Sequence, residues 1–160
     1  MIAVEHETVI HASPAKVWTT IIRFEDYRRW HPFVRISGVP APGAKVDYSF
    51  RVKTGDAPFR TVDARIIEFD AQRGLAFRFG LGWLFAFEET FKMFPAPTGA
   101  RLVHGYRCTG LIGALPLRNL KRLFGKLLDV TDHMLLRHLV FQKPPSGNRR
   151  HARKGFRSSA

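Results

Sequence analysis

The sequence has few of the features that mark disulfide-bonded or membrane-spanning proteins. Its one cysteine, Cys108, cannot form a disulfide within the chain, so we expect a reducing, cytoplasmic location. No run of about 18 apolar residues exists, which argues against a transmembrane helix. The first residues lack the basic and apolar regions of a signal peptide. With 160 residues, the chain is expected to form one soluble domain.

Motifs for nucleotide cofactors and metals are also missing. The sequence contains no glycine-rich phosphate loop and no dinucleotide fingerprint. Its seven histidines lack the spacing with cysteine or acidic residues that metal sites use. The nearest approach to a cluster is Asp129, Asp132 and His133, which we interpret as a solvated helix face. We therefore expect no cofactor and no metal.

Acidic residues are scarce: 13 Asp and Glu stand against 26 Lys and Arg, for a formal net charge of +13. Six of these bases and no acid lie in residues 143–160, which leaves 20 bases against 13 acids before them, or +7. We expect residues 1–142 to form the domain and 143–160 a disordered basic tail. The tail either aids solubility or contacts anionic lipid, an acidic partner or, less readily with one aromatic residue, nucleic acid.

Apolar patterning predicts the elements of one α+β domain. Ser13 and Pro14 are typical of a helix N-cap and first position, and Pro32 should end a second short helix at residues 25–30. Apolar residues at helical spacing from Leu117 predict a long helix of about six turns, after an apolar loop at residues 110–115. Strands are predicted at residues 4–12, 33–38, 45–53, 60–69, 75–79, 84–94 and 101–109.

This order of elements, with short turns between consecutive strands, predicts one antiparallel sheet with the helices gathered on one face. The chain has 14 Phe and 3 Trp, and large aromatic side chains suit the lining of a wide interior. We interpret Trp18 and Trp30 as core anchors between the short helices and the sheet.

Strand parity predicts which side chains face that interior. Folding the last hairpin about residues 95–99 pairs Met93 with Leu102, and therefore Phe91 with His104, Glu89 with Tyr106 and Phe87 with Cys108. The candidate ligand-lining residues on the sheet and the long helix are Tyr48, Phe50, Phe77, Phe79, Phe87, Glu89, Phe91, His104, Tyr106, Cys108, Phe124, Leu128, Thr131 and Leu135.

Glu89, His104 and Tyr106 form a polar spot on this apolar face. A buried carboxylate is costly unless it is paired or protonated, and the other two residues are the expected partners. The spot could orient a ligand's polar group, or act as a general acid and base if burial raises the pKa of Glu89. It could equally be an internal hydrogen-bonded cluster without a ligand. His6, on the first strand, is interpreted as structural or exposed, and Cys108 as a small core residue.

Two turns at one end of the predicted sheet are unusually apolar. One turn contains Leu81, Trp83, Leu84 and Phe85. The other contains Leu111, Ile112, Leu115 and Leu117. Such a rim could be a ligand entrance, a membrane-docking edge or a cap over the core. Basic residues follow directly on the helix and would suit transient contact with anionic lipid: Arg118, Lys121, Arg122 and Lys126.

A set of dispersed positions resembles the START/Bet v 1-like (SRPBCC) superfamily, in particular its polyketide cyclase/dehydrase and lipid transport group. The resemblance spans about residues 3–140. It rests on Ala12-Ser13-Pro14, Val17-Trp18, Phe24, Tyr27, Trp30-His31-Pro32-Phe33, Pro42-Gly43, Gly99-Ala100-Arg101 and Thr109-Gly110. His31 departs from the pattern, which usually has Asn there.

The resemblance implies a helix-grip fold, in which a seven-stranded sheet wraps a long C-terminal helix around a cavity. Members bind lipids, sterols, quinones, polyketides or plant hormones, and some cyclise or hydrolyse their ligands. Three hypotheses follow: a binder or carrier of an apolar small molecule, an enzyme such as a cyclase, dehydratase or hydrolase acting through Glu89, His104 or Tyr106, and an interaction module using the basic tail and the rim. The sequence leaves the ligand and the oligomeric state open.

Overall fold

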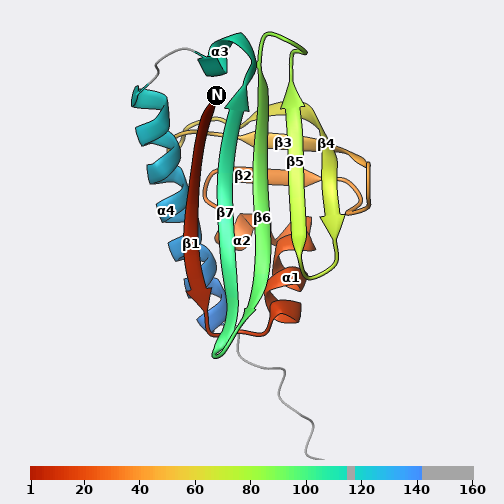
Figure 1. Ribbon diagram of the computed structural model, residues 1–160, viewed down its shortest axis with the longest axis vertical. Coiled ribbons are helices and arrows are strands. Elements are labelled where there is room, and N and C mark those ends of the chain that lie inside the picture. Colours follow the sequence, from red (N-terminus) through yellow and green to blue (C-terminus); the bar gives the residue numbers. More distant parts are fainter. Residues whose placement is uncertain (115–117, 142–160) are drawn as a thin grey trace, which may run out of the picture.

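A computed structural model describes residues 1–114 and 118–141. Seven strands form one antiparallel sheet in the order β1-β7-β6-β5-β4-β3-β2. Figure 1 shows the long strands β1, β7, β6 and β5 side by side, with β2 and β3 running across behind them, so the sheet is strongly curved. The strands are β1 Ile2–Ile10, β2 Val34–Ser37, β3 Lys45–Phe50, β4 Arg60–Asp70, β5 Gly74–Gly80, β6 Ala86–Ala96 and β7 Gly99–Thr109.

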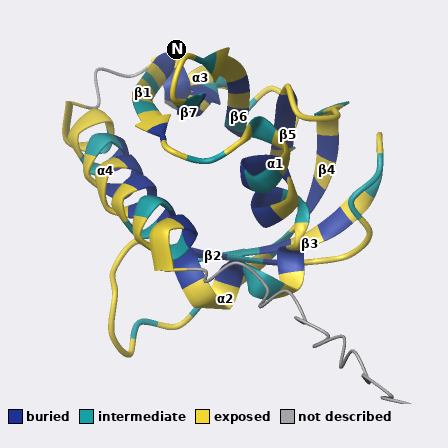
Figure 2. Ribbon diagram, turned by 90° about the horizontal axis from the view of Figure 1, so that it is seen from below, coloured by how far each residue is buried: buried dark blue, intermediate teal, exposed yellow. Residues whose placement is uncertain are grey.

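The predicted α+β helix-grip architecture is confirmed. The long helix α4, Arg118–Phe141, lies along the sheet, and its buried residues face the space that the strands enclose (Figure 2). The shorter elements between β1 and β2 are α1 Pro14–Ile22, a 3-10 turn Phe24–Asp26 and α2 Tyr27–Trp30. Within the two described ranges, no helix is long and apolar enough to cross a membrane.

Local chemistry explains where the first helix starts. The backbone N–H of Lys16 donates to Ser13 Oγ at 3.2 Å, and Pro14 occupies the first turn, as the sequence predicts. Trp18 and Trp30 are both buried, and the Trp18 ring packs edge-on against Phe69 of β4 with 5.2 Å between centroids. Trp18 therefore anchors α1 to the sheet as predicted, and Trp30 is a buried core residue.

The segment after β7 corrects one prediction. Gly110–Ala114 forms a short helix, α3, where the sequence suggested a loop; Leu115 and Leu117 lie outside the described residues. Gly110 has φ 85°, and a Cβ there would meet the carbonyl oxygens of Trp83 and Leu84, both at 2.8 Å. Glycine therefore allows the chain to turn directly into α3 against the β5–β6 turn.

Several strand boundaries differ from prediction by one to three residues, and two of them accompany changes in the adjoining loops. The strand predicted at residues 45–53 ends at Phe50, because the chain leaves the sheet at Arg51, whose side chain donates to the carbonyls of Pro32 and Gly55. β6 begins at Ala86 because the preceding residues form a turn closed by Leu81 N–H to Phe85 O at 2.9 Å. Both differences lengthen a loop at the same end of the sheet, the first between β3 and β4 and the second between β5 and β6.

Candidate functional site

A pocket of about 230 Å³ lies between the concave face of the sheet and the first half of α4. Fifteen residues line it, and nearly all are apolar or aromatic: Phe33, Val34, Tyr48, Phe50, Arg51, Val52, Phe79, Phe85, Phe87, Tyr106, Cys108, Leu120, Leu123, Phe124 and Leu127. Tyr48 and Tyr106 are almost fully buried, whereas Val52 is 48% exposed. The pocket therefore runs from a mouth near Val52 to a closed inner end at the two tyrosines.

Strand register brings the aromatic wall together. The predicted pairs Phe87–Cys108, Glu89–Tyr106, Phe91–His104 and Met93–Leu102 are all present between β6 and β7. On this face the ring of Phe79 lies 5.2 Å from Tyr48 and 5.0 Å from Phe87 between centroids. Such tilted contacts between rings hold the wall in place.

The pocket divides the predicted lining residues in two. Seven of the fourteen line it: Tyr48, Phe50, Phe79, Phe87, Tyr106, Cys108 and Phe124. The other seven lie outside its lining: Phe77, Glu89, Phe91, His104, Leu128, Thr131 and Leu135. All of this second group are buried and packed into the core or into the polar cluster beside it. Parity identified the inward face correctly, but not how far along that face the space extends.

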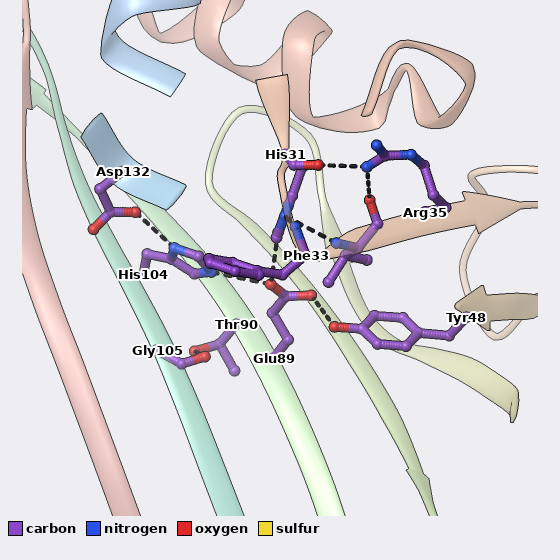
Figure 3. Close-up of polar contacts among 10 residues, drawn as sticks. His31, Phe33, Arg35, Tyr48, Glu89, Thr90, His104, Gly105 and Asp132 are labelled. Carbon is purple, nitrogen blue, oxygen red and sulfur yellow. Dashed lines mark hydrogen bonds and ion pairs between the residues drawn. The ribbon is translucent and has the colours of Figure 1, made fainter. Parts of the chain in front are cut away.

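A chain of hydrogen bonds occupies the filled part of the concave face (Figure 3). Glu89 Oε2 accepts from the hydroxyl of Tyr48 at 2.6 Å. Its Oε1 lies 3.1 Å from His104 Nε2 and 3.4 Å from His31 Nε2. The other ring nitrogen of His104 lies 2.7 Å from Asp132 Oδ1 on α4. We name these five residues the buried polar chain; it ties β3, β6, β7, α4 and the end of α2 together.

The contacts of His31 identify its tautomer. His31 Nδ1 accepts from the backbone N–H groups of Phe33 at 3.3 Å and Val34 at 3.2 Å, so this nitrogen carries no proton. The proton is therefore on Nε2, which donates to Glu89. The ring also stacks on Tyr27 with 5.5 Å between centroids. His31 thus joins the end of α2 to the centre of the sheet.

The charges of the buried polar chain follow from its contacts. Burial acts to raise the pKa of Glu89, but hydrogen bonds from His104 and His31 outweigh it and lower that pKa below its usual range. Burial acts to lower the pKa of His104, but its bonds to Asp132 and Glu89 raise it to about 9. Burial also lowers the pKa of His31 more than Glu89 raises it. At neutral pH, Glu89 is a carboxylate, His104 an imidazolium and His31 neutral.

These charges remove the condition on which acid–base catalysis depended. The catalytic interpretation required burial to raise the pKa of Glu89, and the pKa moves in the opposite direction. Burial and then the charge of Glu89 raise the pKa of Tyr106 well above its ordinary value, so its phenol keeps its proton. Neither Glu89 nor His104 lines the pocket. The partnership of Glu89 with His104 is confirmed, and its role as an internal ion pair is the one that the geometry favours.

The sequence interpretation missed two members of the buried polar chain. Asp132 was assigned to a solvated helix face, but it is 5% exposed because it is one helical turn from Leu128 and Leu135 on the inward side of α4. Asp129 and His133 are exposed, as expected. His31 was noticed only as a departure from the family pattern. Its position beside the buried Trp30 was the available signal.

His6 lies at the edge of this chain. Its Nδ1 is 3.9 Å from Asp132 Oδ2, and its side chain is 33% exposed. That distance exceeds a hydrogen bond. The expectation that His6 is structural or exposed agrees with this position.

The apolar rim lies at the end of the sheet where α3 begins. Leu81, Trp83 and Leu111 are 66%, 77% and 57% exposed, and Leu111 N–H lies 3.4 Å from Trp83 O, so the two turns meet. Leu84 and Phe85 are half-buried, and Phe85 lines the pocket. The basic residues at the start of α4 are exposed: Arg118, Lys121, Arg122 and Lys126. The rim therefore combines exposed apolar turns with positive charge, and it adjoins the pocket.

Known proteins match this chain in sequence family and in fold. Residues 1–130 match the family model described as polyketide cyclase/dehydrase and lipid transport, and the chain belongs to this family. Among curated proteins, none matches the sequence.

Solved structures share the fold at low sequence identity. A START superfamily protein from Mycobacterium smegmatis is 15% identical, with 86% of this chain and 97% of that chain covered and a TM-score of 0.69. A protein from Nitrosomonas europaea is 12% identical, with 89% and 96% covered and a TM-score of 0.68. Ara h 8.0201 is 15% identical, with 86% and 97% covered and a TM-score of 0.63. At these identities, the likeness concerns the fold.

Proposed function

We propose that this protein binds an apolar small molecule in the pocket between the sheet and α4. The observation that carries the proposal is the lining: of fifteen residues, Arg51 alone is charged. Water inside an apolar pocket makes few hydrogen bonds with the walls. An apolar ligand therefore gains free energy by displacing this water and filling the pocket. Family membership supports the same class of ligand, because the family is described by polyketide and lipid chemistry.

Binding without catalysis is the preferred form of this proposal. Tyr48 and Tyr106 are the polar groups at the inner end, and the Tyr48 hydroxyl already donates to Glu89. Glu89 and His104 stabilise each other's charges, and burial keeps His31 neutral and raises the pKa of the Cys108 thiol. No group at the pocket surface is therefore poised to transfer a proton at neutral pH.

The rim supports a second part of the proposal, which is transient contact with a membrane of anionic lipids. Trp83, Leu81 and Leu111 could enter the headgroup region while Arg118 and Lys121 contact lipid phosphates. Such contact would bring the pocket to the place where apolar molecules concentrate.

Filling the pocket tests the binding function. Cys108→Phe would project a ring into the inner end, whereas Val103→Phe, on the same strand, points to the convex face. The neutral dye N-phenyl-1-naphthylamine should bind the wild-type protein and Val103→Phe with one site. Cys108→Phe should weaken dye binding at least about tenfold, because its ring takes up the space. Equal binding by all three proteins, or none by the wild type, would remove the proposal.

A further inference from the structure

Two arginines meet at one aromatic ring beside the pocket. The guanidinium carbons of Arg35 and Arg51 lie 4.9 and 4.6 Å from the centroid of the Phe59 ring. Arg35 comes from β2, Arg51 follows β3, and Phe59 precedes β4, so the loop between β3 and β4 folds back over the cations. Burial, and then the charge of Arg51, lower the pKa of Arg35, in agreement with their closeness.

Neither guanidinium has a carboxylate partner in the described part of the chain. Arg51 donates to the backbone oxygens of Pro32 at 2.9 Å and Gly55 at 2.6 Å. Arg35 donates to the backbone oxygens of His31 and Val34 through Nη1. Among residues 1–114 and 118–141, no bond uses Nη2 of either arginine. The two guanidinium groups are thus stabilised by backbone carbonyl oxygens, and each keeps N–H donors on Nη2 that no described residue uses.

Arg51 lies at the open end of the pocket, and Arg35 shares the Phe59 ring with it. Arg51 lines the pocket next to Val52, which is 48% exposed, and across from Leu120 and Leu123, which are half-buried. The inner end, at Tyr48 and Tyr106, is closed. A ligand whose apolar part fills the pocket would therefore place its outer end against Arg51.

The inner end has the opposite polarity. The Tyr48 hydroxyl already donates its hydrogen bond to Glu89, and the carboxylates of Glu89 and Asp132 lie on either side of the single positive charge of His104. An anionic group placed at the inner end would meet a net negative charge without a free donor from Tyr48. The pocket is therefore polarised along its length, with positive charge outside and negative charge inside.

We propose that the ligand is an anionic amphiphile: one apolar chain or ring enters the pocket, and a carboxylate at its outer end pairs with Arg51 and Arg35. This inference rests on the proposed binding function and names the ligand class. A guanidinium matches a carboxylate through two parallel hydrogen bonds, which suits the unused donors. The volume of about 230 Å³ corresponds to about eight water-sized units of ~30 Å³ each, so it holds a single short chain rather than a two-chain lipid.

The test compares two probes that differ only in the head. Decanoate and decanol, both below their aggregation limits, compete with N-phenyl-1-naphthylamine for the wild-type protein at low salt. Decanoate should bind about tenfold more tightly than decanol, because a hydrogen-bonded ion pair is stronger than a neutral contact. This preference should shrink to within about twofold in Arg51→Gln and in Arg35→Gln, and also at high salt. Arg107→Gln removes the same charge from the convex face and should keep the preference.

Each outcome separates this inference from the binding function. Equal displacement by both probes in the wild type overturns the anionic head and leaves apolar binding intact. A preference that survives in both glutamine variants overturns the assignment to these arginines. If neither probe nor dye binds, the proposed function itself fails. Unchanged decanol affinity in a variant shows that its pocket is preserved. The comparison of decanoate with decanol on the wild-type protein does not depend on any variant folding correctly.

Discussion

The two halves of the concave face have the same strands and opposite contents. On β6 and β7, Phe87, Tyr106 and Cys108 line a pocket, whereas Glu89, Phe91 and His104 are fully buried outside its lining. The filled half holds the buried polar chain, and the hollow half holds aromatic side chains that contact one another around an open space. The comparison indicates two roles: the pair of His104 and Asp132 joins β7 to α4, and the aromatic rings enclose the proposed binding pocket.

The largest loss of stability is expected when a charge is removed from the buried polar chain. Glu89→Ala should lower the free energy of unfolding by about 3–5 kcal/mol, because His104 would stay buried with its charge only partly compensated. Glu88→Ala, one residue away on the convex face, loses only partly exposed pairs with Arg78 and Arg107 and should cost less than about 1 kcal/mol. Urea denaturation measures both, with Glu89→Gln as a milder variant. Similar costs at the two positions would contradict the structural role of the buried polar chain.

The second prediction concerns pH in the same half. The pKa of His104 is raised from 6.5 to about 9 by its carboxylate partners, after opposition from burial. Its stabilisation should be complete below about pH 6.5 and be lost as the pH rises toward 9, by about 3 kcal/mol in total. Glu89, whose pKa is lowered, acts in the opposite sense: its contribution is lost only as the pH falls below its unfolded value of 4.5.

Urea denaturation between pH 6.5 and 9 measures this loss. Asp132→Asn should flatten the decline, since it removes a partner that raises the pKa of His104, and Asp129→Asn on the exposed face of α4 should leave it unchanged. Stability that stays level across this range in the wild type would show that His104 is not the charged centre. The scan ends at pH 9 because burial raises the pKa of Cys108 above 9.0, so this thiol begins to contribute there.

The smallest effect on stability is expected at the rim of the hollow half. Leu81→Ser with Trp83→Ser should change the free energy of unfolding by no more than about 0.5 kcal/mol, because both side chains are exposed. The same double variant should bind phosphatidylglycerol vesicles about tenfold more weakly in co-sedimentation at low salt, owing to the lost apolar area. Val39→Ser removes an equally exposed apolar residue elsewhere and serves as the control. If the wild-type protein does not bind the vesicles, the membrane proposal is wrong.

The fold could be predicted because period and turn chemistry act locally. Alternation in residues 45–50 and helical spacing in α4 each indicate which face of one element is apolar, and Ser13-Pro14 marks where a helix begins. The β6–β7 register followed from one turn and parity alone, because the side-chain period in a strand is two.

The site could be predicted only in part, because it depends on contacts between distant elements. Glu89 and His104 are on neighbouring strands, so parity joined them. Asp132 and His31 meet them only after α4 and α2 dock, which no local pattern reports. A charged residue in the spacing of Leu128 and Leu135 was the one signal for Asp132. The pocket's extent depends on side-chain packing, and parity carries no information about unfilled volume.

The position of Cys108 has an experimental consequence. It is the chain's single thiol, and its side chain lines the pocket. A small alkylating reagent must enter the same space as a ligand to reach the sulfur, so a bound molecule shields it from modification. The time course of alkylation, followed by intact mass, therefore reports occupancy directly, without a dye and without altering the sequence.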